Sequence, residues 1–136
     1  MSLDTTHDCW HGAYSRFSFW RNDIATAAGE PLAEGRIGLL PEIAMDFDER
    51  FTEENYQGYW DEPPSDVLHV LLVHSDCDGV IQHQYTAALA DRLEGLLPAL
   101  GKYDDNDDWR GHYELTKRFI SGLRAAAAAG EDVEFH

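Results

Sequence analysis

Basic residues, cysteines and long apolar segments are all scarce in this chain. Its 136 residues include only 10 Lys and Arg against 26 Asp and Glu, which gives a formal net charge of -16. Such an excess of negative charge repels phosphate backbones and anionic lipid headgroups. We therefore expect no direct binding to nucleic acid and none to a membrane, whereas a divalent cation or a basic protein partner is compatible with the charge.

The apolar segments are too short to cross a bilayer. The longest covers residues 67–73 and is interrupted by His69, whereas a membrane-spanning helix needs about 20 apolar residues. The first residues, "MSLDTTHDCWHG", lack the basic segment and the apolar stretch of a secretory signal peptide. We expect a cytoplasmic protein whose two cysteines, Cys9 and Cys77, are reduced.

The composition predicts one folded domain over residues 1–136. A hydrophobic share of 43% with four tryptophans is typical of a packed core and not of a disordered chain. The sequence has no internal repeat and no linker that would divide it. We expect an α+β domain, mostly helical, with about three amphipathic helices packed on a small sheet.

Three segments have apolar residues at helical spacing, namely 11–28, 83–97 and 109–129. Gly29 and Gly130 follow the first and third segments and are expected to end those helices in the left-handed conformation. The first stripe contains Ala13, Phe17, Trp20, Ile24 and Ala27, and Arg16, Arg21 and Asn22 are placed off it.

The segment "DVLHVLLV", with residues 67–73 inside it, is rich in β-branched residues and lies between "PPS" and "SDCDG". This pattern predicts a buried strand of the small sheet, although its length does not exclude a helix. A second short strand or a tail is expected in "EDVEF", after Gly130.

Residues 46–62 are acidic but also carry five aromatic side chains. A solvated linker would have few aromatics. We expect a loop with one helical turn that docks its aromatic residues on the core. The alternative is a surface that binds a basic protein partner.

The segment "HSDCDG", His74 to Gly79, has the side chains of several metal sites. Counted from His74, it resembles a degenerate EF-hand loop, with Asp76 and Asp78 as oxygen ligands and Gly79 at the sharp turn. His74 and Tyr85 replace the first and last acidic ligands of a calcium loop. The same letters are similar to the first motif of the DHH phosphoesterases, in which two aspartates would hold manganese, but no second "DHH" triplet exists.

A zinc site is the third metal hypothesis. His7, Cys9 and His11 form one group, and His74 and Cys77 form another. The two groups are far apart in the sequence, so only the fold could bring them together. Alternatively, Cys9 is a nucleophile near a helix N-terminus, with His7, His11 or a distant His74 or His112 as base.

The simplest interpretation involves no chemistry. Asp76, Asp78 and Gly79 would then form a tight turn, and Cys9 and Cys77 would be small core residues.

Three blocks, "HDCWHGAYSRFSFWRNDIA", "HSDCDG" and "FISGLRAAAAAGEDVEFH", together resemble a family of small acidic bacterial and phage proteins of unknown function. The resemblance implies that the Cys9 block and the Asp76–Gly79 block meet in one site, and it supplies no activity. The leading hypothesis is a metal or small-ligand site, with Trp10 and Tyr14 as its apolar wall. Its candidate metal ligands are His7, Cys9, His74, Asp76, Cys77 and Asp78, and zinc, manganese or calcium is the candidate ion. The alternative is an acidic interaction protein, in one version a phage-type mimic of nucleic acid.

Overall fold

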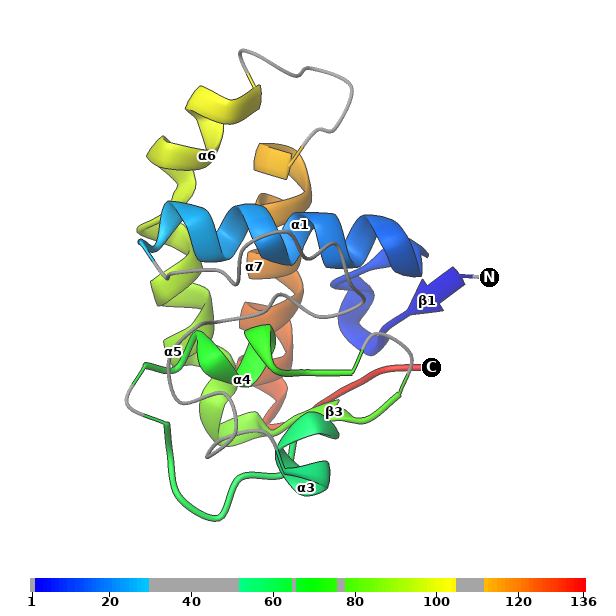
Figure 1. The fold of residues 1–136 in the computed structure, drawn as a ribbon. Coiled ribbons are helices and arrows are strands. Elements are labelled where there is room, and N and C mark those ends of the chain that lie inside the picture. The colour runs from blue at the N-terminus through cyan, green and yellow to red at the C-terminus, as the bar shows by residue number, and fades with distance from the viewer. Residues whose placement is uncertain (1, 30–51, 65, 76–77, 105–111) are drawn as a thin grey trace.

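Helices dominate the fold, and very short strands lie between them (Figure 1). The computed structural model describes residues 2–29, 52–64, 66–75, 78–104 and 112–136. Its elements are β1 (Ser2–Asp4), η1 (Thr6–Asp8), β2 (His11–Ala13), α1 (Tyr14–Ala27), α3 (Glu53–Tyr56), α4 (His69–Leu72), β3 (Val80–Ile81), α5 (His83–Glu94), α6 (Leu97–Asp104), α7 (His112–Ala129) and β4 (Val133–Glu134). The predicted class, α+β and mostly helical, is confirmed.

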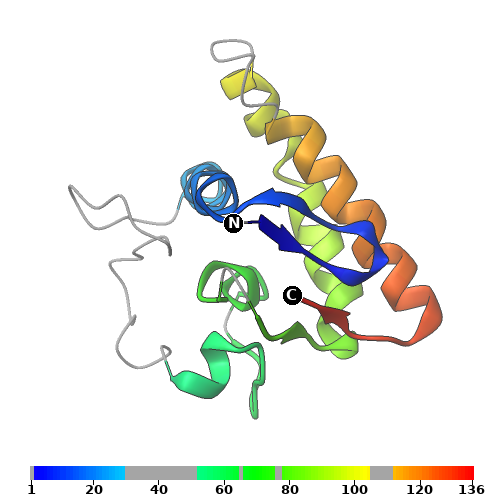
Figure 2. The same ribbon diagram turned by 90° about the vertical axis from the view of Figure 1, so that its right-hand side faces the viewer.

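Helices α5 and α7 lie side by side, and α6 continues along the other end of α7 (Figures 1 and 2). The helix predicted over 83–97 is thus two helices, because α5 ends at Glu94 and α6 begins at Leu97. Pro98 fits the first turn of α6, where its missing N–H has no helical partner to lose. The helix predicted over 109–129 is confirmed from His112 onward, and Gly130 follows it with a φ of 67°.

Helix α1 crosses the α5–α7 pair and buries Phe17, Trp20 and Ile24 (Figure 1). The Trp20 Nε1–H donates a hydrogen bond of 2.9 Å to Thr116 Oγ1 on α7. The predicted helix over 11–28 starts later, at Tyr14, because the three residues before it pair with β1 as β2.

The predicted strand over residues 67–73 is wrong. Residues His69–Leu72 form α4, and the N–H groups of Leu72 and Val73 donate to carbonyls four residues earlier, at 3.0 Å. The side chains of this segment are buried on all faces of the helix. The sequence therefore has no polar positions at helical spacing that would distinguish a helix from a strand. A helix bonds its own backbone and can sit alone in the core, whereas a strand would need a neighbouring strand.

The last residues of the chain join two small antiparallel sheets (Figure 2). β4 pairs with β3, and Phe135 N–H donates to Gly79 O at 2.9 Å. On the other side, Phe135 forms a bridge with Thr5, and Asp4 and His136 exchange hydrogen bonds of 3.0 and 2.9 Å. The short strand predicted after Gly130 is confirmed, and it lies between β1 and β3.

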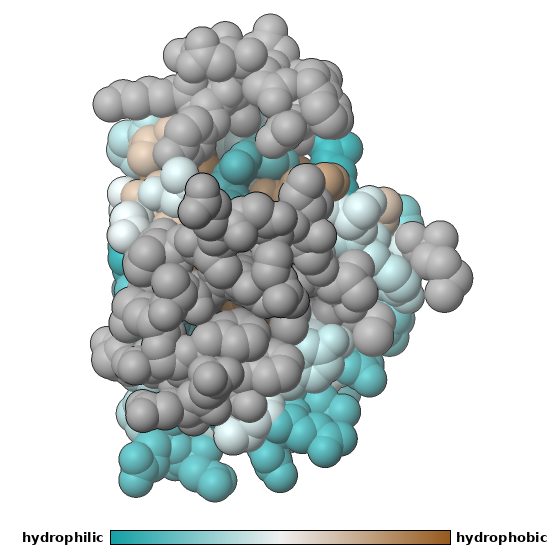
Figure 3. Space-filling view, viewed as in Figure 1, coloured by the Kyte–Doolittle hydropathy of each residue, from teal (hydrophilic) through white to brown (hydrophobic). Residues whose placement is uncertain are grey.

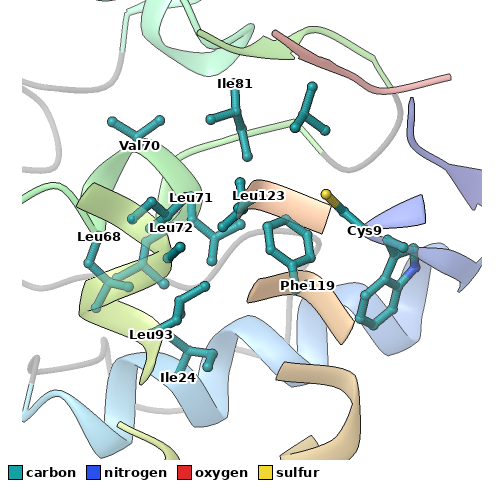
Figure 4. Packing of buried hydrophobic residues seen from close by; sticks show 14 of the residues in the cluster. Cys9, Ile24, Leu68, Val70, Leu71, Leu72, Ile81, Leu93, Phe119 and Leu123 are labelled. Atoms are coloured by element: carbon teal, nitrogen blue, oxygen red, sulfur yellow. The ribbon is translucent and has the colours of Figure 1, made fainter. Parts of the chain in front are cut away.

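The buried apolar side chains form one cluster to which the N-terminal segment and α1, α4, α5 and α7 contribute (Figure 4). In Figure 4 the Cys9 sulfur points toward α7, near Phe119 and Leu123. Within the described part of the chain, no helix has both the length and the apolarity to cross a bilayer.

Gly122 on α7 allows the N-terminal segment to approach closely, and we predict that Gly122→Ala destabilises the protein. A Cβ at this position would lie 2.4 Å from Cys9 Sγ and 2.8 Å from the His7 carbonyl oxygen. Overpacking costs roughly 1–3 kcal/mol, which exceeds the gain of about 1 kcal/mol in helix propensity. The free energy of unfolding is measured by urea denaturation.

The matched control is Gly101→Ala on α6, where the new Cβ would meet Tyr113 at an ordinary 3.5 Å. This variant should be as stable as the wild type or slightly more stable. A Gly122→Ala protein with wild-type stability would show that the contact between η1 and α7 is looser than described.

Candidate functional site

A row of aromatic rings connects Trp10 to His74 through the core. The ring centroids are 5.1 Å apart for Trp10 and Phe17, 5.8 Å for Phe17 and Phe135, and 4.1 Å for Phe135 and His74. The fold therefore brings the Trp10 segment and the His74 segment to opposite sides of the Phe17–Phe135 pair.

His74 is fully buried, and both of its ring nitrogens lie against backbone carbonyls. Nδ1 is 2.7 Å from Ser75 O, and Nε2 is 2.8 Å from Val80 O. A carbonyl only accepts, and a neutral imidazole has a single N–H to donate, so only one of these contacts is a hydrogen bond in the neutral ring. Burial lowers the pKa of His74 from 6.5 to about 4, against the opposing effect of the two carbonyls.

A buried cation lies beside His74. Arg21 on α1 is fully buried, and its guanidinium donates to the carbonyls of Leu71, at 3.4 Å, and His74. Its Cζ atom lies 4.4 Å from the centroid of the Phe17 ring. Arg21 thus binds one carbonyl in the last turn of α4 and one just after the helix, where the helix dipole favours a positive charge. It also helps to keep the pKa of His74 low.

Sequence reasoning did not find Arg21, because it was placed off the apolar stripe. The signal was present: Arg21 follows Phe17 by four positions and precedes Ile24 by three, so all three lie on one face of α1. Phe135 was also missed, because a short terminal segment gives no clear period.

The end of α3 and the residues after it cover the turn that contains His74. Ser75 N–H donates to Tyr56 O at 2.7 Å, and Val80 N–H donates to Gln57 O at 2.9 Å. The backbones meet so closely at Gly58 that a Cβ there would lie 1.6 Å from Val80 O. The polar backbone groups around His74 are therefore bound by protein groups.

The predicted one-turn helix in residues 46–62 is confirmed by α3, and residues 46–51 lie outside the described residues. Thr52 caps α3 by accepting a hydrogen bond of 3.1 Å from Asn55 N–H. Trp60 docks on the core as expected, whereas its neighbour Tyr59 is exposed.

Of the predicted metal ligands, Cys9 is buried in the core against Gly122. Burial raises the pKa of its thiol to about 12, so it carries a proton at neutral pH. In this conformation Cys9 packs as a small apolar side chain. It is not poised as a thiolate, which is the form that attacks carbonyls or binds zinc.

The other predicted ligands are dispersed. The Nε2 atom of His7 lies 3.4 Å from Oε1 of Glu131, a residue just after α7. Asp78 is exposed, and its N–H donates to Ser75 Oγ at 3.3 Å. Asp76 and Cys77 lie outside the described residues, so the calcium, manganese and zinc hypotheses that use them stay predictions. Among the side chains that are described, no three His, Cys, Asp or Glu residues converge on a point that would hold a metal ion.

The predicted apolar wall belongs to the core. Trp10 is 2% exposed and packs on Phe17 and Trp20, and its backbone N–H donates to Thr5 Oγ1 at 3.0 Å. Tyr14, half-buried at the start of α1, packs against the same cluster.

The buried neutral His74 predicts a pH dependence of stability. Between pH 6.5 and about 4 the unfolded chain takes up a proton at this residue while the folded chain does not. The free energy of unfolding should therefore fall as the pH drops through this range, by about 3 kcal/mol at 1.36 kcal/mol per unit of pKa shift. Urea denaturation at several pH values measures the slope.

The comparison variant is His74→Gln, which keeps one amide donor but does not titrate. It is expected to be less stable at pH 7 and to lose this part of the slope. An unchanged slope in the variant would mean that other groups cause the acid sensitivity.

Comparison of the chain with models of protein families, with curated proteins and with solved structures finds no match.

Proposed function

We propose that this protein is an acidic interaction protein that binds a basic protein partner through the segment around α3. We call this segment, residues 52–62, the acidic aromatic surface. The observation that carries the proposal is the exposure of Tyr59. This residue is 49% exposed, whereas the neighbouring Trp60 is 7% exposed. Acidic side chains surround this tyrosine in the sequence and are exposed, namely Glu53, Glu54, Asp61 and Glu62.

The acidic aromatic surface is held in place by the core. Trp60 is buried, and its backbone N–H donates to Gln82 Oε1 at 3.3 Å. The carbonyls of Tyr56 and Gln57 accept from the turn that follows α4. A segment fixed in this way loses little conformational entropy when a partner binds, and this supports a role in binding.

The chemistry of the surface favours a basic partner. Tyrosine is enriched in protein interfaces and can accept a lysine or arginine against its ring. The net charge of -16 attracts a basic protein over a long range and raises the rate of encounter. Hydrophilic residues gather at the end of the molecule near α3 (Figure 3). A basic protein that normally binds nucleic acid would meet these requirements, and this chain would then act as a mimic of nucleic acid. A cytoplasmic location is part of this proposal.

A second candidate function is the metal or small-ligand site of the Cys9 and Asp76–Gly79 blocks. The row of rings from Trp10 to His74 supports it, because it links the residue after Cys9 to a residue two positions before Asp76. The buried Cys9 and the carbonyl-bound ring of His74 count against it.

We predict that partner binding depends on Tyr59 and on salt. A photo-crosslinking amino acid at position 59 should capture a basic protein in cells. With that protein purified, Tyr59→Ala should weaken binding by about ten-fold or more, as for an interface hot spot. The affinity should fall steeply as salt is raised, because screening acts on exposed charges, and EDTA should have no effect. Affinities are measured by isothermal titration calorimetry.

A matched pair of variants separates this surface from the overall charge. One variant neutralises Glu53, Glu54, Asp61 and Glu62. The other neutralises four exposed acids elsewhere, namely Asp91, Glu94, Glu114 and Glu134. Both lose the same charge, and only the first should lose most of its affinity. Equal losses in the two variants would show that no particular surface is used.

The second candidate is tested by the metal content of tag-free protein, measured by mass spectrometry. Under our proposal Asp76→Asn and Cys77→Ser leave the metal content unchanged. About one equivalent of zinc or manganese that disappears in either variant would instead establish the site at residues 76–79.

A further inference from the structure

Three potential metal ligands lie in one row across neighbouring strands at the ends of the chain. Asp4 on β1 is directly opposite His11 on β2. On its other side, Asp4 N–H donates to His136 O at 3.0 Å, and His136 N–H donates to Asp4 O at 2.9 Å. This double exchange is the hydrogen-bonded pair of an antiparallel ladder, so Asp4 and His136 are also directly opposite each other. The order across the strands is His11, Asp4, His136.

All three side chains project from the outer face of the strands. Residues directly opposite each other in antiparallel strands have their side chains on the same face. The neighbours that alternate with them, Leu3 and Phe135, are buried. His11 and His136 are exposed, and Asp4 is partly exposed. The row therefore faces solvent, where an ion can enter.

The spacing of the row suits a small cation. Opposite side chains have Cβ atoms roughly 5 Å apart, so each histidine stands about that far from Asp4. An ion bound to the Asp4 carboxylate at about 2 Å is within reach of imidazole nitrogens on both sides. The His11 ring already contacts the Asp4 carboxylate through Nδ1.

We propose that His11, Asp4 and His136 form a surface site for a divalent transition metal, with zinc as the best fit. Two imidazoles and one carboxylate suit zinc and its neighbours better than calcium or magnesium. Water completes the tetrahedron, as in sites with three protein ligands. Only His11 of this site was considered as a zinc ligand from the sequence, and Asp4 and His136 were not.

Binding requires rotation of side chains and not of the backbone. In their present positions no three ligands of the described residues converge. The His11 and His136 rings are exposed and can turn about their side-chain bonds, while the strand pairing fixes their Cα atoms. Glu134 is exposed two residues before His136 on the same strand face, and it adds negative charge beside the ion.

A metal ion at this site would link strands from the two ends of the chain. His11 and Asp4 come from the first strands, and His136 belongs to the segment that joins them to β3. An ion that binds the folded chain more tightly than the unfolded chain raises its stability. Zinc should therefore raise the Tm of the wild-type protein.

The experiment is a titration of tag-free, full-length protein with Co²⁺, followed by its visible absorption, in excess Mg²⁺ to occupy isolated carboxylates. Competition with Zn²⁺ then gives the zinc affinity. Asp4→Asn, His11→Gln and His136→Gln are compared with a control, His83→Gln. The control removes an exposed histidine that pairs with a single carboxylate, that of Asp132, at 3.1 Å.

We expect about one equivalent of tetrahedral Co²⁺ in the wild type and in the control, and an affinity at least about ten-fold lower in each of the three variants. The rise of Tm with zinc should disappear in His136→Gln, whose exposed side chain is not needed for packing. Absence of saturable binding by the wild type would overturn the proposal. So would binding that is unaffected by His11→Gln and His136→Gln, or that is lost only in Asp76→Asn and Cys77→Ser.

Discussion

The insertion of the last strand between β1 and β3 is the interaction on which the rest of the structure depends. It supplies partners for backbone groups on both sides, which would otherwise be exposed strand edges. It also places the Phe135 ring between Phe17 and His74, so the same few residues complete the sheet and the core. The insertion pairs residues from opposite ends of the chain, so a long loop must close before these contacts can form. Because loop closure costs entropy, we expect these contacts to form late in folding.

The insertion of the last strand also explains how the core around His74 can accommodate polar groups. Arg21 binds carbonyls at and just after the end of α4, His74 lies against the carbonyls of Ser75 and Val80, and the Phe135 ring packs against the His74 ring. Buried polar groups are stable only when such partners are present. The histidine that resembled a ligand or a base in "HSDCDG" is therefore fixed by backbone contacts, and its low pKa results from that burial.

The sequence predicted the helices of this fold better than its sheet. A long stripe such as that of α1 repeats its period several times, so Phe17, Trp20 and Ile24 were recognised as a buried face. The segment of α4 is apolar throughout and has no period, and β-branched content then favoured the wrong element. The strands β1 and β2 are three residues each, and their pairing depends on contacts across the chain.

The candidate site was predicted only in part, for a related reason. The resemblance implied that the Cys9 block and the Asp76–Gly79 block meet in one site, and this stays a prediction because Asp76 and Cys77 lie outside the described residues. The described ring contacts link Trp10 to His74 only through Phe17 and Phe135. Which atoms face each other could not be inferred, because the partners of His74 are mostly carbonyls, which every residue carries. The alignment of His11, Asp4 and His136 could not be inferred either, although His11 was considered as a zinc ligand, because only strand register aligns residues so distant in the sequence.

The two proposed activities use the negative charge of the chain in different ways. Attraction of a basic partner is a sum over many exposed carboxylates, so it is long-ranged and is weakened by salt. Coordination of a metal depends on three atoms at bonding distance, and salt hardly changes it. One bound divalent ion would move the formal charge from -16 only to -14, since -16 + 2 = -14. The long-range field that attracts a partner would therefore be almost the same with the metal bound, and any coupling between the two sites would have to pass through the strands and not through charge.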